Sequence, residues 1–375
     1  MADNKELCRL TRNSAKILDK NIVLLDYKNH YDLDGLMKKG VSNIAELIAH
    51  VVKFSSMKES DFTIGTAKGG GCSSFDAFTP DGDHIMGRNF DFKVAPCLVL
   101  WTHPEGYYSS LSVVDHNFIT YGNKHNVFTG KNSAQLILSP YCCVDGINEK
   151  GLTIAVLQIR AKATQQNDKS KTDITTTSMV RAVLDTCANV DEAVELFKKF
   201  NMHDSLYCCY HYFLADSSGR AVIVEYIDNK LNVYEKNSEK YGVENSVFEN
   251  DGHKLTYMTN YSVTKDIGSF EIEQHGYDRT DAIKNAFVEK NNVMTELEAM
   301  DLLSYVKLDY DHPKYPWRIE ALWSAVYNTT KRTMKIVAGM DYSKVYTFSI
   351  DEPCKVLMTE AIEKSEYPAA NWDYL

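Results

Sequence analysis

The feature that most constrains the fold is a change in hydrophobic pattern at a run of three glycines, residues 69–71. Before it, the segments 17–27 and 43–56 carry apolar residues at three- and four-residue spacing, which is typical of amphipathic helices. After it, short segments rich in aromatic and β-branched residues alternate with turn signals, which predicts strands and hairpins. We therefore expect a helical segment over 1–71 and a strand-rich region over 72–375.

Helical and strand patterns continue to alternate along the rest of the chain. Helical spacing covers 176–200, with an expected break near Asn189, and returns over 278–289 and 296–306. Three strand-like segments follow the last of these helices. No repeat of fixed period and no long linker divides the chain. This order favours a layered α+β fold in which sheets pack on each other and helices lie outside.

Charge and hydropathy exclude two kinds of partner. The chain carries 41 Lys and Arg against 51 Asp and Glu, a net charge of −10, and no basic block that could hold phosphates. We therefore expect no nucleic-acid partner. No apolar run approaches the roughly 18 residues that span a bilayer, so we expect no membrane span. The first twenty residues have mixed charge and lack the apolar stretch of a secretory signal, which favours a cytoplasmic location.

The nine cysteines and eleven histidines form no recognisable metal motif. The cysteine count is odd, two pairs are adjacent, and no CxxC spacing occurs. These features disfavour both a disulfide framework and a structural zinc site. The HExxH motif of zinc proteases is also missing. We expect neither a metal nor another cofactor.

Cys72 is the strongest candidate for chemistry because it follows the glycines and begins a predicted hairpin. If the turn is centred between Asp81 and Gly82, a regular antiparallel ladder places Asp91 opposite Cys72, about 5 Å away on the same face. Arg88 would then face the other side of its strand and would need a bulge to reach the thiol. Taken alone, such a cysteine can equally be an ordinary small apolar residue.

The hairpin also carries the motifs of a known family. Cys72-Ser-Ser-Phe, the turn Pro-Asp-Gly and Gly87-Arg88-Asn89-Phe90-Asp91 resemble the amino terminus of mature choloylglycine hydrolases, which are N-terminal nucleophile (Ntn) hydrolases. Arg88 follows Cys72 by 16 residues and Asp91 follows it by 19. These intervals match those between the nucleophile, arginine and aspartate of the family. The resemblance extends in order from residue 72 to the closing strands, about four-fifths of the chain.

Later segments continue this resemblance. Asp-Gly-Ile-Asn-Glu-Lys-Gly-Leu at 145–152 is similar to the segment before the second strand pair of the family. Met-Thr-Asn-Tyr at 258–261 resembles the segment that bears the oxyanion-hole asparagine, which corresponds here to Asn260. Tyr-Asp-Arg-Thr at 277–280 places Arg279 at the second arginine of the family.

The resemblance implies both a fold and a reaction. The fold is a four-layer αββα sandwich of two packed, mainly antiparallel sheets with helices outside. The reaction is hydrolysis of a linear, non-peptide amide C–N bond in a small N-acyl molecule. Autocleavage between Gly71 and Cys72 would free an α-amine, whose ordinary pKa of about 7.7 to 8.0 suits a general base. The thiol would form an acyl-thioester that water resolves.

The resemblance also implies a role for each matched residue. Asp91 would hold the new amine, and Arg88 would lower the thiol pKa by its charge. Asn260 would donate to the oxyanion, and Arg279 would orient the cluster or a substrate carboxylate. Gln158 stands where bile-salt hydrolases usually have asparagine, and its amide is a tentative substrate or oxyanion contact.

Several alternatives stay open at this stage. The 71-residue segment before Cys72 is longer than the segment that bile-salt hydrolases remove. It resembles instead the propeptides of acid ceramidase-like amidases and penicillin acyltransferases. An acyltransferase would use the same acyl-enzyme, and a non-catalytic binding protein could share the fold. A papain-like protease is disfavoured because its Cys-Gly-Ser-Cys-Trp signature is missing. The acyl and amine parts of the substrate, the fate of residues 1–71 and a possible homo-oligomer are not decided.

Overall fold

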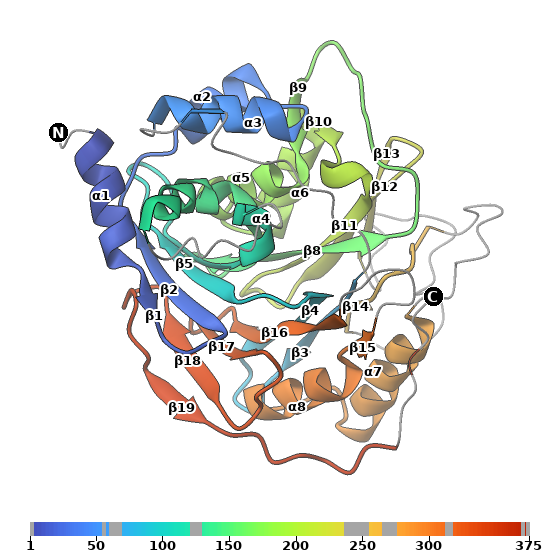
Figure 1. Cartoon of the computed structure of the whole chain (residues 1–375). Coiled ribbons are helices and arrows are strands. Elements are labelled where there is room, and N and C mark those ends of the chain that lie inside the picture. Colours follow the sequence, from blue (N-terminus) through green and yellow to red (C-terminus); the bar gives the residue numbers. More distant parts are fainter. Residues whose placement is uncertain are drawn as a thin grey trace.

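Two central sheets enclosed by helices make up the molecule (Figure 1). The computed structural model describes residues 4–54, 58–59, 70–120, 130–235, 255–264, 276–311, 318–368 and 372 of the chain. Within these ranges the layers follow in the order helices, sheet, sheet, helices. The predicted α+β sandwich with helices outside is confirmed.

The first sheet has nine strands in the order β1-β2-β5-β6-β7-β8-β11-β12-β13. Its strands are β1 (Lys16–Ile17), β2 (Ile22–Tyr27), β5 (Cys97–Thr102), β6 (Ser110–Asp115), β7 (Cys143–Asn148), β8 (Thr153–Ile159), β11 (Cys209–Ala215), β12 (Ala221–Ile227) and β13 (Lys230–Glu235). Neighbouring strands are antiparallel except for β2 and β5, which run parallel.

The second sheet has eight strands in the order β14-β3-β4-β16-β17-β18-β19, and β15 pairs with β16. Its strands are β3 (Gly71–Phe78), β4 (His84–Lys93), β14 (Tyr257–Met258), β15 (Asp309–Asp311), β16 (Arg318–Asn328), β17 (Thr333–Ala338), β18 (Val345–Ser349) and β19 (Met358–Glu360). A separate parallel pair consists of β9 (Thr172–Thr175) and β10 (Phe200–His203).

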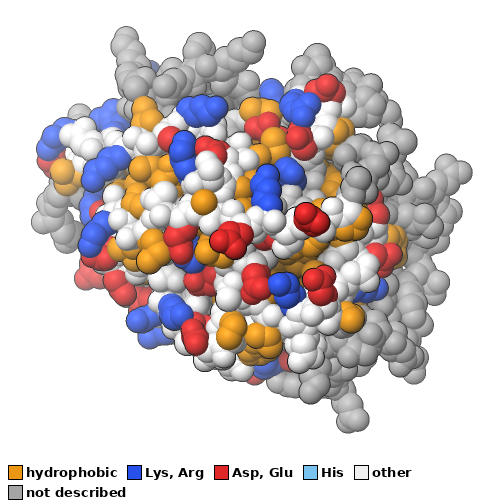
Figure 2. All heavy atoms as spheres, turned by 90° about the horizontal axis from the view of Figure 1, so that it is seen from below, with side chains coloured by type: hydrophobic (Ala, Val, Ile, Leu, Met, Phe, Trp, Pro, Cys, Tyr) orange, Lys and Arg blue, Asp and Glu red, His pale blue; other side chains and the backbone are white. Residues whose placement is uncertain are grey.

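Helices cover the outer face of each sheet, α2 to α6 on the nine-stranded sheet and α7 and α8 on the other (Figure 1). The α-helices are α1 (Asn4–Ser14), α2 (Leu33–Lys39), α3 (Ile44–Val51), α4 (His116–Thr120), α5 (Thr176–Thr186), α6 (Val190–Lys199), α7 (Tyr277–Glu289) and α8 (Glu296–Val306). The 3₁₀ segments are η1 (Val52–Phe54), η3 (Gly130–Cys142) and η4 (Ser205–Tyr207). Among the described helices, none is long and apolar enough to cross a membrane. On the face of the molecule in Figure 2, basic and acidic side chains are interspersed among the described residues.

The predicted helices after the hairpin are confirmed. The helical pattern over 176–200 forms α5 and α6, and Asn189 separates them as the N-cap of α6, where its side chain accepts the Glu192 N–H at 3.0 Å. The patterns over 278–289 and 296–306 form α7 and α8. The helix predicted within 43–56 forms α3 and η1, and its last two residues lie outside the described part of the chain.

The helix predicted over 17–27 is wrong, because this segment forms strands β1 and β2. Five of the six residues of β2 are buried, so the strand is covered on both faces. A strand that is buried on both faces has a continuous apolar sequence instead of an alternating one. A short run of this kind cannot be distinguished from a buried helix by its spacing.

Residues before Cys72 are built into the fold. Strand β2 lies between β1 and β5, with Ile22 opposite Cys97 at the start of a six-residue parallel ladder. The Tyr31 hydroxyl donates to Asp185 on α5 at 2.7 Å, and both side chains are buried. The segment 1–71 therefore supplies an interior strand of the larger sheet in addition to helices α1 to α3.

We expect a chain that begins at Cys72 to aggregate. Without β2, the apolar strand β5 becomes a sheet edge, and burial of four apolar side chains at Ile22–Leu25 is lost, each worth roughly 1.5–3 kcal/mol. Gel filtration and circular dichroism would measure this loss of the compact state. Co-expression of residues 1–71 as a separate fragment should restore it. A truncated chain that is monomeric and unfolds cooperatively would contradict the prediction.

Candidate active site

The ladder of the β3–β4 hairpin determines what surrounds Cys72. Cys72 lies opposite Phe90. Asp91 lies opposite Gly71, so the predicted pairing of Asp91 with Cys72 is wrong by one residue. Because successive side chains of a strand point to opposite faces, Asp91 lies on the other face of the sheet from the thiol. The same shift places Arg88 on the face of the thiol, and no bulge in the β3–β4 ladder is needed.

The length of the turn explains this shift. Three residues, 80–82, separate Thr79 from Asp83, and the Thr79 N–H donates to the Asp83 carbonyl at 2.8 Å. A three-residue loop centres the pairing on Asp81 instead of between Asp81 and Gly82. Gly82 has φ of +86°, the left-handed conformation that such loops commonly place at a glycine.

Arg88 connects the two sheets beside the thiol. Its buried guanidinium donates from Nε to Asp145 on β7 at 3.2 Å and from Nη2 to the Val156 carbonyl on β8 at 2.7 Å. Burial raises the pKa of Cys72, although hydrogen bonding and attraction to Arg88 oppose this rise. The charge of Arg88 therefore acts on the thiol pKa in the predicted direction, but burial outweighs it in the intact chain and the net pKa is raised.

Asp91 lies on the face of the sheet that packs against α7 and α8. Its Oδ1 accepts the main-chain N–H of Leu308 at 3.3 Å. Its Oδ2 is buried, has no hydrogen-bond donor among the described residues, and lies 3.9 Å from Arg279 Nη1. Burial raises the pKa of Asp91 to about 7, against the opposing charge of Arg279. An acceptor oxygen that lacks a donor within the described part of the chain thus lies on the residue opposite Gly71.

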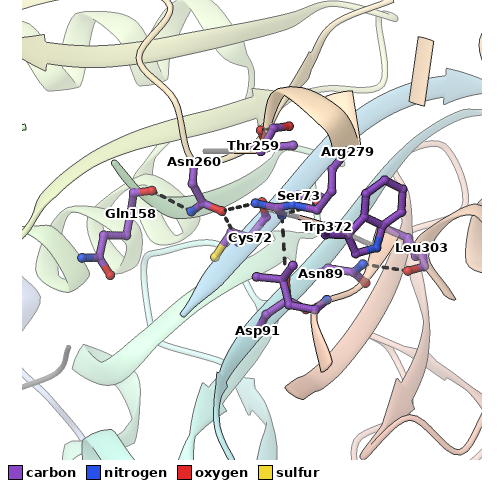
Figure 3. Close-up of polar contacts among 12 residues, drawn as sticks. Cys72, Ser73, Asn89, Asp91, Gln158, Thr259, Asn260, Arg279, Leu303 and Trp372 are labelled. Carbon is purple, nitrogen blue, oxygen red and sulfur yellow. Dashed lines mark hydrogen bonds and ion pairs between the residues drawn. The ribbon is translucent and has the colours of Figure 1, made fainter. Parts of the chain in front are cut away.

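Arg279 on α7 brings Asn260 and the main chain of Cys72 together (Figure 3). Its Nη1 donates to the Cys72 carbonyl at 2.7 Å and to Ser73 Oγ at 3.0 Å. Its Nη2 donates to Asn260 Oδ1 at 2.7 Å. The same Oδ1 accepts the main-chain N–H of Cys72 at 2.7 Å. The structure therefore places Cys72, Asn260 and Arg279 in one buried hydrogen-bond network.

Gln158 joins the site through its main chain. Its carbonyl accepts a hydrogen bond from Asn260 Nδ2 at 2.7 Å, and its side chain extends away from Asn260 (Figure 3). A primary amide has two N–H donors, so Asn260 keeps one for another acceptor. A contact between the Gln158 side chain and substrate stays a prediction.

The glycines before Cys72 allow a close approach to neighbouring groups. A Cβ on Gly71 would lie 2.2 Å from Leu308 Cδ1. Gly70 has φ of +121°, and a Cβ there would lie 2.7 Å from the Asp91 carbonyl oxygen. At Gly70 a side chain would meet backbone in a left-handed conformation, which favours glycine, whereas at Gly71 it would require the Leu308 side chain to move. Gly69 lies outside the described residues.

Two polar residues of the site were not predicted. Asp145 accepts hydrogen bonds from Arg88 and from Trp323 Nε1, the latter at 3.1 Å. A carboxylate inside an apolar strand is a signal that a buried donor lies nearby. Ser73, which accepts from Arg279, gives no comparable signal in the sequence. Within the described ranges, no group of three or more His, Cys, Asp or Glu residues could hold a metal ion.

Comparison with known proteins identifies the family of this chain. The family model described as linear amide C–N hydrolases, choloylglycine hydrolase family, matches residues 72–286, more than half of the chain. A bile salt hydrolase/transferase of Clostridium perfringens is 26% identical over 179 residues, which are 44% of this chain and 51% of that protein. The match thus spans about half the length of this curated relative.

Solved structures support the fold. A variant of the conjugated bile acid hydrolase from Clostridium perfringens has a TM-score of 0.53 at 16% identity, and the match covers 79% of this chain and all of that one. A second variant of the same enzyme has a TM-score of 0.52 at 14% identity, with 80% and 99% covered. Together with the four layers described above, these matches identify the αββα sandwich of Ntn hydrolases. With the match that begins at Cys72, they show that this chain belongs to the choloylglycine hydrolase family of linear amide C–N hydrolases.

Proposed function

We propose that this chain cleaves itself between Gly71 and Cys72 and then hydrolyses a linear amide of a small N-acyl molecule, with Cys72 as N-terminal nucleophile. One observation carries the proposal. The Cys72 nitrogen that cleavage would release already donates to Asn260, in a site where the buried Oδ2 of Asp91 has no donor among the described residues. Membership of the family supports the same reaction.

The processing step needs no group from outside the chain except water. The Cys72 thiol adds to the Gly71 carbonyl carbon, and the bond from that carbon to the Cys72 nitrogen breaks. The nitrogen takes up a proton and becomes the free amine, while Gly71 is held briefly as a thioester. Water then hydrolyses the thioester to leave a carboxylate on Gly71 and a free thiol on Cys72. Gly70, the residue before Gly71, has a positive φ that glycine adopts readily.

Turnover repeats this chemistry on a substrate. The α-amine of Cys72 accepts the thiol proton as the sulfur attacks the amide carbonyl, and it then donates a proton to the leaving nitrogen. The second N–H of Asn260 Nδ2 is available for the oxyanion, and Arg279 holds the Asn260 carbonyl side in place. Asp91 supplies the negative charge that keeps the amine near the thiol. Water completes the reaction by hydrolysing the acyl-thioester.

Acyl transfer is the second candidate activity, because an amine can replace water at the same acyl-enzyme. The Clostridium perfringens relative is named as both a hydrolase and a transferase. A panel of bile-salt conjugates, phenoxyacetyl penicillins, N-acyl homoserine lactones and N-acyl ethanolamines, tested with and without an amine acceptor, would identify the substrate. It would also separate hydrolysis from transfer.

Cys72→Ala should abolish both processing and amide hydrolysis, because it removes the sulfur that forms the thioester. Intact mass should show the wild-type chain divided after Gly71 and the variant chain whole, with similar circular dichroism. Cys354→Ala serves as the control, since this partly buried cysteine belongs to a different part of the fold. Wild-type protein that keeps residues 1–71 attached and is fully active would refute the free-amine mechanism.

Asn260→Ala should lower kcat by roughly 10² to 10³, which is the effect of losing one oxyanion donor. The apparent substrate affinity should change much less, because the lost hydrogen bond strengthens in the transition state. Steady-state kinetics on whichever amide of the panel is hydrolysed would measure both. If kcat did not fall, or if KM rose by the same factor as kcat fell, Asn260 would have a purely structural role.

Asp91→Asn should stabilise the uncleaved Cys72→Ala chain by a margin that grows with pH. Below about pH 4 the carboxyl is protonated in both folded and unfolded chains. Between about pH 4 and 7 it ionises only in the unfolded chain, because burial raises the folded pKa from 3.8 to about 7. The free energy of unfolding of the chain that keeps Asp91 therefore falls over this range. The fall is on the order of a few kcal/mol, at ~1.4 kcal/mol per pKa unit.

Thermal unfolding of the two chains from pH 4 to 8 would measure this margin. Asp81→Asn is the matched control, because Asp81 lies exposed in the turn of the same hairpin. A margin that does not change with pH would show that Asp91 is not a strained buried carboxyl in the intact chain.

A further inference from the structure

A buried histidine and a buried glutamate hold the turn that carries Asn260. His211 on β11 and Glu225 on β12 are directly opposite each other in the nine-stranded sheet, and both are fully buried. His211 Nδ1 lies 3.3 Å from Glu225 Oε2. His211 Nε2 lies 2.9 Å from the main-chain carbonyl of Thr259, the residue before Asn260. The turn 259–264 is thus held at its beginning by the contact between His211 and the Thr259 carbonyl.

Glu225 binds the other end of the same turn. Its Oε2 accepts the Val263 N–H at 3.0 Å. Its Oε1 accepts the Thr264 N–H at 3.1 Å and the Thr264 hydroxyl at 2.7 Å, together with the hydroxyl of Ser262. Burial would raise the pKa of this carboxyl, but the hydrogen bonds from His211, Ser262 and Thr264 lower it. Glu225 is therefore an ionised acceptor surrounded by donors.

Both ring nitrogens of the histidine have a partner inside the protein. One faces a carboxylate oxygen of Glu225 and the other faces the carbonyl of Thr259. Buried polar groups are retained where such partners replace water.

We propose that His211 and Glu225 are positioning residues that fix Asn260 at Cys72, an inference that rests on the amide hydrolysis proposed above. Asn260 comes from a turn, and the described chain around it has only the two-residue strand β14 as regular structure. The hydroxyl of Thr259 also donates to the Gly276 carbonyl at 2.9 Å and lies 3.2 Å from the Thr280 hydroxyl. A misplacement of about 1 Å can cost 10²-fold in rate, so the accuracy of the Asn260 amide depends on this pair.

Glu225→Gln is the sharpest test of the pair, because every group that contacts the carboxylate is a donor. A glutamine keeps one acceptor oxygen but presents an NH₂ group at the other position. In either orientation, this NH₂ faces the N–H of Val263 or that of Thr264. One attachment of the turn is lost while the volume of the side chain is unchanged.

His84→Gln provides the matched control. His84 is also buried and also joins a carboxylate to a carbonyl, with Nε2 2.8 Å from Asp76 and Nδ1 2.7 Å from the Asp216 carbonyl. It lies at the turn end of the β3–β4 hairpin, whereas Cys72 lies at the opposite end. Both substitutions should lower the melting temperature, since each disrupts a buried hydrogen-bonded pair.

In the processed enzyme, we expect Glu225→Gln to lower kcat by 10- to 100-fold with less than threefold change in KM. His84→Gln should leave kcat within threefold of wild type. Hydrogen exchange of residues 259–264, measured on full-length chains that also carry Cys72→Ala, reports on the turn without any need for activity. Exchange there should be faster with Glu225→Gln and unchanged with His84→Gln.

These readouts distinguish the two proposals. If wild-type protein hydrolyses none of the amides but the exchange pattern is as expected, the pair still positions Asn260 and only the proposed function fails. If exchange at 259–264 is unchanged by Glu225→Gln, the inference is overturned. It is equally overturned if exchange becomes faster while self-cleavage and kcat stay at the wild-type level.

Discussion

Burial of the Arg279 guanidinium is the constraint on which the site depends. An unpaired cation in the protein interior costs several kcal/mol, so this side chain must find acceptors wherever it is buried. It finds the Cys72 carbonyl, Ser73 Oγ and Asn260 Oδ1, with the Asp91 carboxylate 3.9 Å away. Strand β3, strand β4, helix α7 and the turn after β14 are thereby drawn to one point. The Cys72 carbonyl, Ser73 and Asn260 lie where they do because the buried charge of Arg279 needs acceptors.

Cys72 lies between two separate sets of charges, one on each face of its sheet. Its thiol shares the inner face with Arg88, whose own charge is balanced by Asp145 on the opposing sheet. The outer face carries Asp91 and Arg279, which lie beside the main chain. The two faces can therefore act on different atoms of one residue, the inner set on the sulfur and the outer set on the nitrogen. A pairing shifted by one residue would exchange these two environments.

Periodicity predicted the layers and helices correctly because amphipathic helices and half-buried strands repeat their apolar residues at different intervals. It failed at β2, where burial on both faces removes the alternation, and at the hairpin, where one extra turn residue shifts the ladder. The contact of Asn260 with Cys72 spans 188 residues, and only the family motifs indicated it. The hydrogen bond from Asn260 to the main-chain carbonyl of Gln158 and the pair His211–Glu225 have no local pattern, since both join segments that meet only in the folded protein.

The unsatisfied oxygen of Asp91 indicates what cleavage before Cys72 would change. Its Oδ2 is buried and has no hydrogen-bond donor among the described residues, which is costly, and a neutral amide nitrogen adds no positive charge to that of Arg279. Conversion of that nitrogen into an ammonium group would supply it, so breaking the bond would relieve a strain that the intact chain carries. The sheet would keep its order, because β2 is held between β1 and β5 by ladders that do not involve Gly71. The charge at the site can therefore change while the fold that positions it stays in place.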